Sequence, residues 1–251
     1  MLMENLRIST IIPNFNHGHL ITRALESVVG QSFRPVEVIV VDDGSTDNSL
    51  KIVDEFVQTF QFVKLISIKQ NVGALVAGGI ATNASSGNYL HFLAADDELL
   101  PDAYKTFRDS FQLFPNRTFY SGEAIVNEIE LQKTYIRPLI RPSNKIVHIA
   151  PAVFSELLRK GDNYIMTMSA LVNKKTFLEY GGFDSSLGPQ CDSFFFRKLA
   201  LTTGFVYCPK PITKWNVSIM GLSRQQYLNP DFINSEITRV KILIKNDEVF
   251  P

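Results

Sequence analysis

The chain has 251 residues, of which 45% are hydrophobic and 20% charged, a balance typical of a globular protein and not of a disordered one. Its 25 basic side chains equal its 25 acidic ones, which argues against nucleic-acid binding through a basic surface. Two cysteines are too few for a disulfide framework, and no apolar run reaches the ~18–20 residues that span a membrane. Because the first residues also lack the pattern of a signal peptide, we expect a cytosolic protein.

The first part of the chain alternates between strand signals and helix signals. Short β-branched and apolar runs predict four buried strands, at residues 6–15, 36–45, 62–71 and 88–97. Apolar or small residues at helical spacing predict helices between them, at residues 16–31, 45–56 and 72–85. Ser45 or Thr46 is expected to cap the second helix, with Asp47 in its first turn. This alternation predicts parallel βαβ units with helices on both faces of the sheet.

The rest of the chain is less regular. The predicted elements are helices at 101–115, 155–163 and 192–204, a hairpin or two antiparallel strands at 118–142, a strand followed by a helix at 164–184, and a strand at 205–215. The apolar spacing of Ile233, Ile237, Val240 and Ile244 predicts an amphipathic C-terminal helix. We find no repeat, low-complexity segment or Ser/Gly linker, which favours one domain with two halves.

Polar residues follow three of the predicted parallel strands: Pro13 to Asn16, Asp42 to Ser45, and the pair Asp96 and Asp97. Ligands of such sheets bind beyond the carboxyl ends of the strands, so these residues are expected to share one edge and one site. The carboxylates of Asp96 and Asp97 suit Mg²⁺ or Mn²⁺, which prefer a few carboxylates together with substrate phosphates. The alternative is that this pair caps the helix that follows.

The carboxylates that follow the second predicted strand are expected to have different roles, according to their positions. Asp42 lies at the end of its strand and is suited to accept hydrogen bonds from a base or a ribose. Asp43, Ser45 and Asp47 fit turn and cap roles. His91 alternates within a predicted strand and is expected to be an interior residue with its hydrogen bonds satisfied.

Three stretches resemble a known family when they are taken in order and at their spacing. They are TIIPNFNHGHLITRALESVVGQSFRPVEVIVVDDGSTDNS, NVGALVAGGIATNASSGNYLHFLAADDELLPDA and GGFDSSLG, and they resemble the family 2 glycosyltransferases of the GT-A fold. The resemblance implies an α/β protein with a Rossmann-like, mainly parallel sheet flanked by helices. Residues 1–224 would form one domain, with a nucleotide-sugar-binding half at 1–105 and an acceptor-side half at 106–224. Residues 225–251 would be a C-terminal helical extension.

The resemblance also implies an activity. Members of this family transfer a sugar, usually with Mg²⁺ or Mn²⁺, from a nucleotide-sugar donor to an acceptor hydroxyl with inversion. For this chain it favours a UDP-sugar donor, a hexosyl-type reaction and a glycan or lipid-linked acceptor, in bacterial surface polysaccharide synthesis. It implies no nucleic-acid partner, a place in the cytoplasm or at the inner face of the membrane, and room for peripheral membrane association. The oligomeric state is left open.

Carried over position by position, the resemblance assigns eight residues to the nucleotide sugar. They are Pro13, Asn14, Phe15, Asn16, Asp42, Gly73, Asp96 and Asp97. The first four would line the nucleotide, Asp42 would face the base, and Gly73 would lie in the loop beside the nucleotide. Asp96, the last carboxylate of the DXD motif, would meet the metal.

The chain departs from the family pattern at three places. Ala94 stands where many members have a first DXD carboxylate, Gly78 and Gly79 replace an Arg-Asn pair, and Ser218 lies near the place of a His. Neutralisation of the diphosphate would therefore rest more on the cation, or on Lys214 and Arg224.

The resemblance places the catalytic base after GGFD, before a helix. Ungapped counting selects Gln190 and Cys191 there, while a shift of one residue selects Asp192, which alone has the chemistry of a base. Asp192 is also placed to cap the helix that follows, and Asp184 fits a turn. The rival interpretation of the whole chain is a non-catalytic nucleotide- or glycan-binding relative of the same fold.

Overall fold

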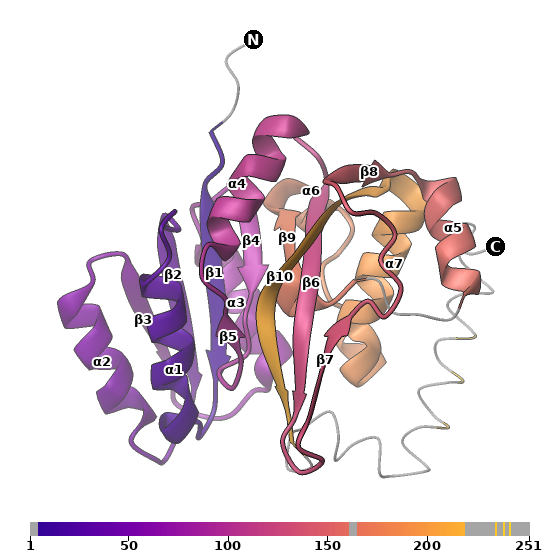
Figure 1. Cartoon of the computed structure of the whole chain (residues 1–251). Coiled ribbons are helices and arrows are strands. Elements are labelled where there is room, and N and C mark those ends of the chain that lie inside the picture. The colour runs from indigo at the N-terminus through magenta and orange to yellow at the C-terminus, as the bar shows by residue number, and fades with distance from the viewer. Residues whose placement is uncertain (1–4, 161–164, 219–233, 235–237, 239–240, 242–251) are drawn as a thin grey trace.

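The computed structural model describes residues 5–160 and 165–218 together with 234, 238 and 241, and its strands form one mixed sheet (Figure 1). The strands are β1 (Ile8–Asn14), β2 (Glu37–Asp43), β3 (Val63–Ile68), β4 (Tyr89–Phe92), β5 (Glu98–Leu99), β6 (Phe119–Glu128), β7 (Lys133–Arg137), β8 (Val147–Ile149), β9 (Ala170–Asn173) and β10 (Phe205–Val217). The helices are α1 (Gly18–Val29), α2 (Ser49–Thr59), α3 (Ala74–Ala84), α4 (Ala103–Leu113), α5 (Pro151–Arg159), α6 (Lys174–Glu179) and α7 (Cys191–Thr203), with short 3-10 turns η1 (Thr167–Ser169) and η2 (Ser185–Gln190).

The first four strands are parallel neighbours in the order β3-β2-β1-β4, as their alternation with helices predicts. β9 then pairs antiparallel with both β4 and β6, so it joins the two halves of the sheet. β10 pairs parallel with β6 and antiparallel with β5, the strand that follows the Asp96–Asp97 pair. The predicted hairpin is confirmed, because β6 and β7 pair antiparallel.

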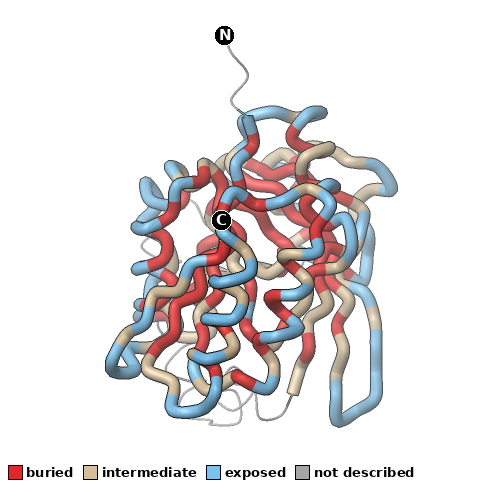
Figure 2. The backbone as a smooth tube through the Cα atoms, turned by 90° about the vertical axis from the view of Figure 1, so that its left-hand side faces the viewer, coloured by how far each residue is buried: buried red, intermediate tan, exposed pale blue. Residues whose placement is uncertain are grey.

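Successive strand residues pack on opposite faces of the sheet. On β1, Ile12 belongs to the core cluster that includes residues of α1, α2 and α4, whereas Ile11 belongs to the cluster that includes residues of α3, α5, α6 and α7. Val40 and Val41 on β2 divide in the same way. A continuous apolar run is therefore needed in the central strands, because both faces are covered. Buried residues run through the middle of the molecule, while exposed residues line the helices and connections (Figure 2).

The observed ends of three helices differ from the predicted ones. α2 begins at Ser49 and not at residue 45, so the predicted caps Ser45 and Thr46 and the first-turn position of Asp47 are wrong. α5 begins at Pro151, whose fixed φ suits the first turn of a helix, ahead of the predicted start at residue 155. α4 begins at Ala103, beyond Pro101.

The predicted C-terminal helix and the boundary at residue 224 lie outside the described residues. Among the helices of the described part, none is long and apolar enough to cross a membrane.

Candidate active site

The residues predicted to form a site lie at the carboxyl edge of the sheet. β1, β2 and β4 run parallel and end there, and Asn14 stands opposite Asp42 in the β1–β2 register. β9 runs the other way, so η1, which precedes it, lies at the same edge. Thr167 of η1 contacts Asp192 at the start of α7 through a hydrogen bond. Asp192 is thereby placed at the edge that carries the nucleotide-binding candidates.

Asp42 holds the turn after β2 against the end of β1. One carboxylate oxygen accepts from the Asn14 side-chain nitrogen at 2.8 Å, and the other accepts from the backbone N–H of Ser45 at 2.9 Å. The Ser45 hydroxyl in turn accepts from the backbone N–H of Asn16 at 2.9 Å, a residue at φ 54°. Ser45 is therefore a turn residue that serves β1, which explains why it does not cap α2.

The cluster of Asn14, Asp42 and Ser45 is largely buried, and the side-chain oxygen of Asn14 accepts no hydrogen bond among the described residues. Asp42 has no exposed surface, and Asn14 is 2% exposed, with its side-chain oxygen also buried. Phe15, in contrast, is 40% exposed at the rim. A nucleoside would meet Phe15 first, and the oxygens of Asn14 and Asp42 would become reachable only if the turn moved.

Asp43 and Asp47 brace the loops around this cluster. Asp43 accepts from the backbone N–H groups of Val72 and Gly73, both at 2.8 Å, which fixes the loop before α3. Asp47 accepts from the N–H groups of Gly18 and Ser49, at the starts of α1 and α2. Their predicted turn-and-cap roles are confirmed, although Asp47 precedes α2 instead of lying in its first turn.

A glycine is needed at position 73 because of its backbone conformation, and not because a side chain would clash with neighbouring atoms. Its φ is 92°, a conformation that L side chains rarely adopt, and a Cβ built there would meet nothing within 4 Å. The open space beside it agrees with the predicted place of Gly73 in a loop that faces a ligand.

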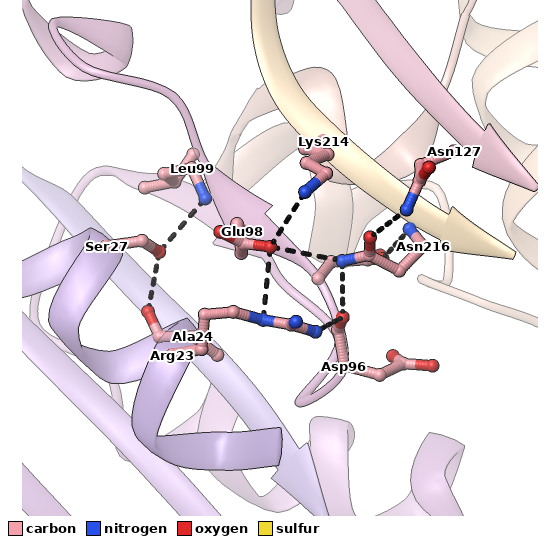
Figure 3. A network of polar contacts seen from close by, with 10 residues as sticks. Arg23, Ala24, Ser27, Asp96, Glu98, Leu99, Asn127, Lys214 and Asn216 are labelled. Atoms are coloured by element: carbon pink, nitrogen blue, oxygen red, sulfur yellow. Dashed lines mark hydrogen bonds and ion pairs between the residues drawn. The ribbon is translucent and has the colours of Figure 1, made fainter. Parts of the chain in front are cut away.

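The Asp96 turn is clamped through its backbone, which leaves its side chain free (Figure 3). The backbone carbonyl of Asp96 accepts from Arg23 at 3.2 Å and from the Asn216 side chain at 2.9 Å. The carboxylate of Asp96 points away from this network (Figure 3), and within the described residues it accepts no hydrogen bond. Arg23 and Asn216 were missed by sequence reasoning, because only the folded sheet brings α1 and β10 to this turn.

Asp97 is a structural partner of that clamp. It is 2% exposed and accepts from the Asn216 backbone N–H at 2.9 Å. Burial, reinforced by the charge of Asp96, raises the pKa of Asp97 well above its usual value. The alternative that the Asp96–Asp97 pair caps the next helix is wrong, because β5 intervenes before α4 begins at Ala103.

The residues of this turn fit a cation held partly by a substrate. The described part of the chain contains no group of three His, Cys, Asp or Glu side chains that could enclose a metal. Asp96 alone offers an unengaged carboxylate here, and Ala94, at the position of the family's first motif carboxylate, is exposed. Mg²⁺ and Mn²⁺ are commonly bound through one or two carboxylates and substrate phosphates, so this donor set fits such an ion only when a diphosphate completes it.

Of the two side chains predicted to neutralise a diphosphate, Lys214 and Arg224, only Lys214 is among the described residues. Lys214, 37% exposed, lies 3.6 Å from the carboxylate of Glu98, which also pairs with Arg23 at 3.1 Å (Figure 3). Lys214 therefore faces the Asp96 turn but shares Glu98 with Arg23. Arg224 lies outside the described residues.

Asp192 lies within the first turn of α7, whose N-cap is Gln190, so the predicted capping role is wrong. One of its oxygens accepts from the Thr167 hydroxyl at 2.7 Å, and the other accepts from the backbone N–H of Ser193. Burial raises the pKa of Asp192, against the lowering effect of these hydrogen bonds and of the Arg197 charge. A carboxylate with a raised pKa is a stronger base, which suits proton removal near neutral pH.

The neighbouring candidates for the base are less suited. Burial raises the pKa of Cys191 to about 12, which keeps it a neutral thiol. Asp184 is an exposed turn residue, as predicted, and accepts from the backbone N–H of Ser186. His91 is fully buried with both ring nitrogens hydrogen-bonded, to Met168 and Tyr104, which confirms the interior role.

Comparison with known proteins finds a family match over part of the chain. The family model described as Glycosyl transferase family 2 matches residues 9–121, which contain the Asn14, Asp42, Gly73 and Asp96 regions of the site. Residues 9–121 therefore resemble the members of glycosyltransferase family 2. Asp192 lies beyond this matched family 2 segment, so its assignment depends on the geometry at the sheet edge.

Several relatives share the family 2 segment. The uncharacterized glycosyltransferase YibD of Escherichia coli (strain K12) is 35% identical over 106 residues, which are 42% of this chain and 30% of that protein. Chondroitin synthase of Escherichia coli is 37% identical over 105 residues, and a teichoic acid poly(glycerol phosphate) polymerase of Staphylococcus epidermidis is 33% identical over 106. Each of these two matches covers 42% of this chain and 15% of the relative, so this chain spans about a third or less of the three proteins.

The matched segment and the region after it share their fold with a solved structure. The crystal structure of S. aureus TarS 1–349 in complex with UDP-GlcNAc matches with a TM-score of 0.73 at 18% identity, over 97% of this chain and 68% of that one. The structure of the same protein in complex with UDP matches with a TM-score of 0.67 at 17% identity, over 97% and 76% of the two chains. The GT-A fold expected from the sequence is thereby confirmed.

Proposed function

We propose that this protein is an inverting glycosyltransferase that moves a hexosyl-type sugar from a nucleotide-sugar donor to a hydroxyl of a glycan or lipid-linked acceptor. The observation that carries the proposal is the pairing, at one edge of the sheet, of an unengaged Asp96 carboxylate with an Asp192 of raised pKa. The first is suited to a cation–diphosphate and the second to proton removal. A UDP-sugar is the donor we favour, because TarS, which has the same fold, is solved with UDP-GlcNAc and with UDP.

The chemistry assigned to the chain's own residues is a single displacement. Asp192 takes the proton of the acceptor hydroxyl as that oxygen attacks the anomeric carbon, and the nucleoside diphosphate leaves from the opposite face. Pro13 to Asn16 and the loop at Gly73 hold the nucleotide so that donor and acceptor meet in line. A Mg²⁺ or Mn²⁺ ion at Asp96, when bound, would neutralise charge on the leaving diphosphate.

The setting is also part of the proposal. Chondroitin synthase and the teichoic acid polymerase, which share the matched segment, are named for polymers. We therefore place the protein in bacterial surface polysaccharide synthesis, in the cytoplasm or at the inner face of the membrane, with peripheral attachment to it allowed. The rival function is a non-catalytic binding relative, which the absence of a carboxylate at Ala94 favours.

A nucleotide panel tests the proposal. Nucleoside diphosphates and nucleotide sugars are added with and without Mn²⁺, and thermal unfolding is followed. A ligand at 100 times its dissociation constant adds about 2.7 kcal/mol of stability, which such a measurement detects. We expect UDP and a UDP-sugar to stabilise the protein in the presence of Mn²⁺ and the sugar nucleotide to be slowly hydrolysed. Binding without any hydrolysis or transfer would favour the rival. No binding of any nucleotide would contradict the proposed function and leave only a glycan-binding relative.

A further inference from the structure

Thr167 joins the candidate base to the middle of the sheet. Its hydroxyl donates to one carboxylate oxygen of Asp192 at 2.7 Å, across 25 residues of sequence. The two residues come from different elements, since Thr167 belongs to η1 and Asp192 to α7. The orientation of the Asp192 carboxylate therefore depends on how firmly η1 is held.

The η1 turn is fixed on one side by Ser169. Its hydroxyl donates to the backbone carbonyl of Glu123 on β6 at 3.0 Å and lies 2.6 Å from the Thr213 hydroxyl on β10. Because the single Ser169 proton goes to a carbonyl, which can only accept, Thr213 is the donor in the second bond. Ser169, Glu123 and Thr213 are fully buried, so this side of the turn is shielded from solvent.

His91 fixes the other side of the turn. The carbonyl of Met168 lies 2.8 Å from Nε2 of His91, and because a carbonyl only accepts, Nε2 carries the proton. Nδ1 then accepts from the Tyr104 hydroxyl at 2.9 Å, and Tyr104 accepts from Thr10 at 2.6 Å. Burial lowers the pKa of His91 to about 4, so the ring is neutral near pH 7 and keeps this tautomer.

We propose that Thr167 is a positioning residue for Asp192, held in place by the buried contacts of Ser169 and His91. The inference rests on the proposed function, because it assigns the Asp192 carboxylate to proton removal. Thr167 directs one oxygen of Asp192 toward η1, which leaves the remaining lone pairs for an acceptor hydroxyl. It also donates to the ionised form, which lowers the pKa of the carboxyl against the effect of burial.

Charged and titratable groups near Asp192 also affect its pKa. Arg197 on α7 lowers its pKa, and Cys191 on α7 is a neutral thiol. At the N-cap of η2, the exposed Asp184 acts on the neighbouring Cys191. Thr167 lowers the pKa of Asp192 through a direct hydrogen bond, so removal of its hydroxyl should raise that pKa.

The test compares Thr167→Val, which removes the hydroxyl at nearly constant shape, with Thr167→Ser, which keeps it. The carboxyl carbon of Asp192 is titrated by NMR, and its signal is identified by its loss in Asp192→Asn. A hydrogen bond to a charged group corresponds to roughly 1–2 pH units, so Thr167→Val should raise the pKa by about that much. Thr167→Ser should stay near wild type, and so should Thr202→Val, since the exposed Thr202 hydroxyl donates only to the Lys198 carbonyl within α7.

The pH dependence of nucleoside diphosphate release from UDP-GlcNAc, with water as acceptor and Mn²⁺ present, separates positioning from structure. The acid limb of kcat/KM should move upward with the NMR pKa in Thr167→Val, and kcat should fall about 10-fold while the donor KM is unchanged. An unmoved pKa, or a moved pKa with an unmoved acid limb, would overturn the proposal. If Thr167→Val does not fold, Thr167→Ala takes its place in the same comparison.

Failure of the proposed function gives a different result. Near wild-type turnover in Asp192→Asn would remove Asp192 as the base, whatever the Thr167 variants do. A loss of turnover in Asp192→Asn with a wild-type profile in Thr167→Val would keep the base and reject the positioning residue.

Discussion

Two carboxylates at opposite edges of the sheet, the buried Glu37 and the partly buried Asp192, have opposite properties. At the amino edge, Glu37 at the start of β2 accepts from Ser9 at 2.6 Å, from Lys64 at 2.6 Å and from Ser86. Burial alone would raise its pKa, but these hydrogen bonds outweigh it and lower the pKa of Glu37 to about 2. At the carboxyl edge, burial outweighs the hydrogen bonds to Asp192 and its pKa is raised.

The difference separates a structural carboxylate from a reactive one. Glu37 has a cationic partner and several donors, so its charge is stabilised in the folded state. Asp192 has a hydroxyl and one N–H in direct contact, with the Arg197 charge acting alongside them, so part of its preference for a proton is retained. Stability is expected to depend on the first residue and activity on the second.

The largest effect is expected for Asp192→Asn. The amide keeps the shape of the side chain but cannot take a proton, so kcat should fall about 10²–10⁴-fold, the usual contribution of a positioned base. Because folding raises the pKa of Asp192, its ionisation costs stability as the pH rises through that pKa, and the variant should unfold no more readily than wild type at pH 7. Turnover and thermal unfolding of the same preparation check both statements; unchanged turnover would make Asp192 a helix residue only.

Glu37→Gln should lower stability and leave activity unchanged, the reverse of the result expected for Asp192→Asn. At pH 7 we expect a loss of about 2 kcal/mol in the free energy of unfolding, less than the full pKa difference implies because Lys64 is exposed. Since folding lowers the pKa of Glu37 from 4.5 to about 2, its contribution is present above pH 4.5 and is lost as the pH falls toward 2. Urea unfolding across that window should show the two proteins converge, while nucleotide binding stays at the wild-type level. A variant as stable as wild type at pH 7 would contradict the assignment.

Sequence reasoning succeeded where the signal is local. The apolar runs of β1, β2 and β4 ending in polar residues predict the sheet and the edge that holds Asn14, Asp42 and Asp96. It could not find the clamp on the Asp96 turn, because Asn216 is 120 residues away in the chain and arrives only through the pairing of β10 with β5. The start of α2 was misplaced because the Ser45 hydroxyl serves Asn16 instead of the helix.

A smaller effect is expected for Asp42→Ala. If Asp42 contacts the nucleoside, the donor KM should rise about 10-fold with a lesser change in kcat, as for lost uniform binding. Ser45→Ala is the matched control, because it loosens the same turn without removing the carboxylate. Steady-state kinetics with equal changes in both variants would mean that Asp42 acts only by ordering the turn.

The smallest effect is expected for Ala94→Asp. Ala94 is exposed next to the Asp96 turn, so a carboxylate there should be tolerated and should tighten Mn²⁺ binding several-fold. The concentration of Mn²⁺ giving half-maximal nucleotide binding measures this. We predict that this concentration falls in Ala94→Asp. A concentration that rises would mean that residue 94 does not face the cation.

The most direct test of the difference between the two edges is calorimetric titration of UDP into wild type, Asp96→Ala and Glu37→Gln, each with and without Mn²⁺. Wild type and Glu37→Gln should bind UDP with the same Mn²⁺-enhanced affinity, because Glu37 lies at the opposite edge. Asp96→Ala should fold normally and lose the enhancement, because its carboxylate takes no part in the clamp that holds the turn. Full Mn²⁺ enhancement in Asp96→Ala would contradict a nucleotide–cation site at the carboxyl edge.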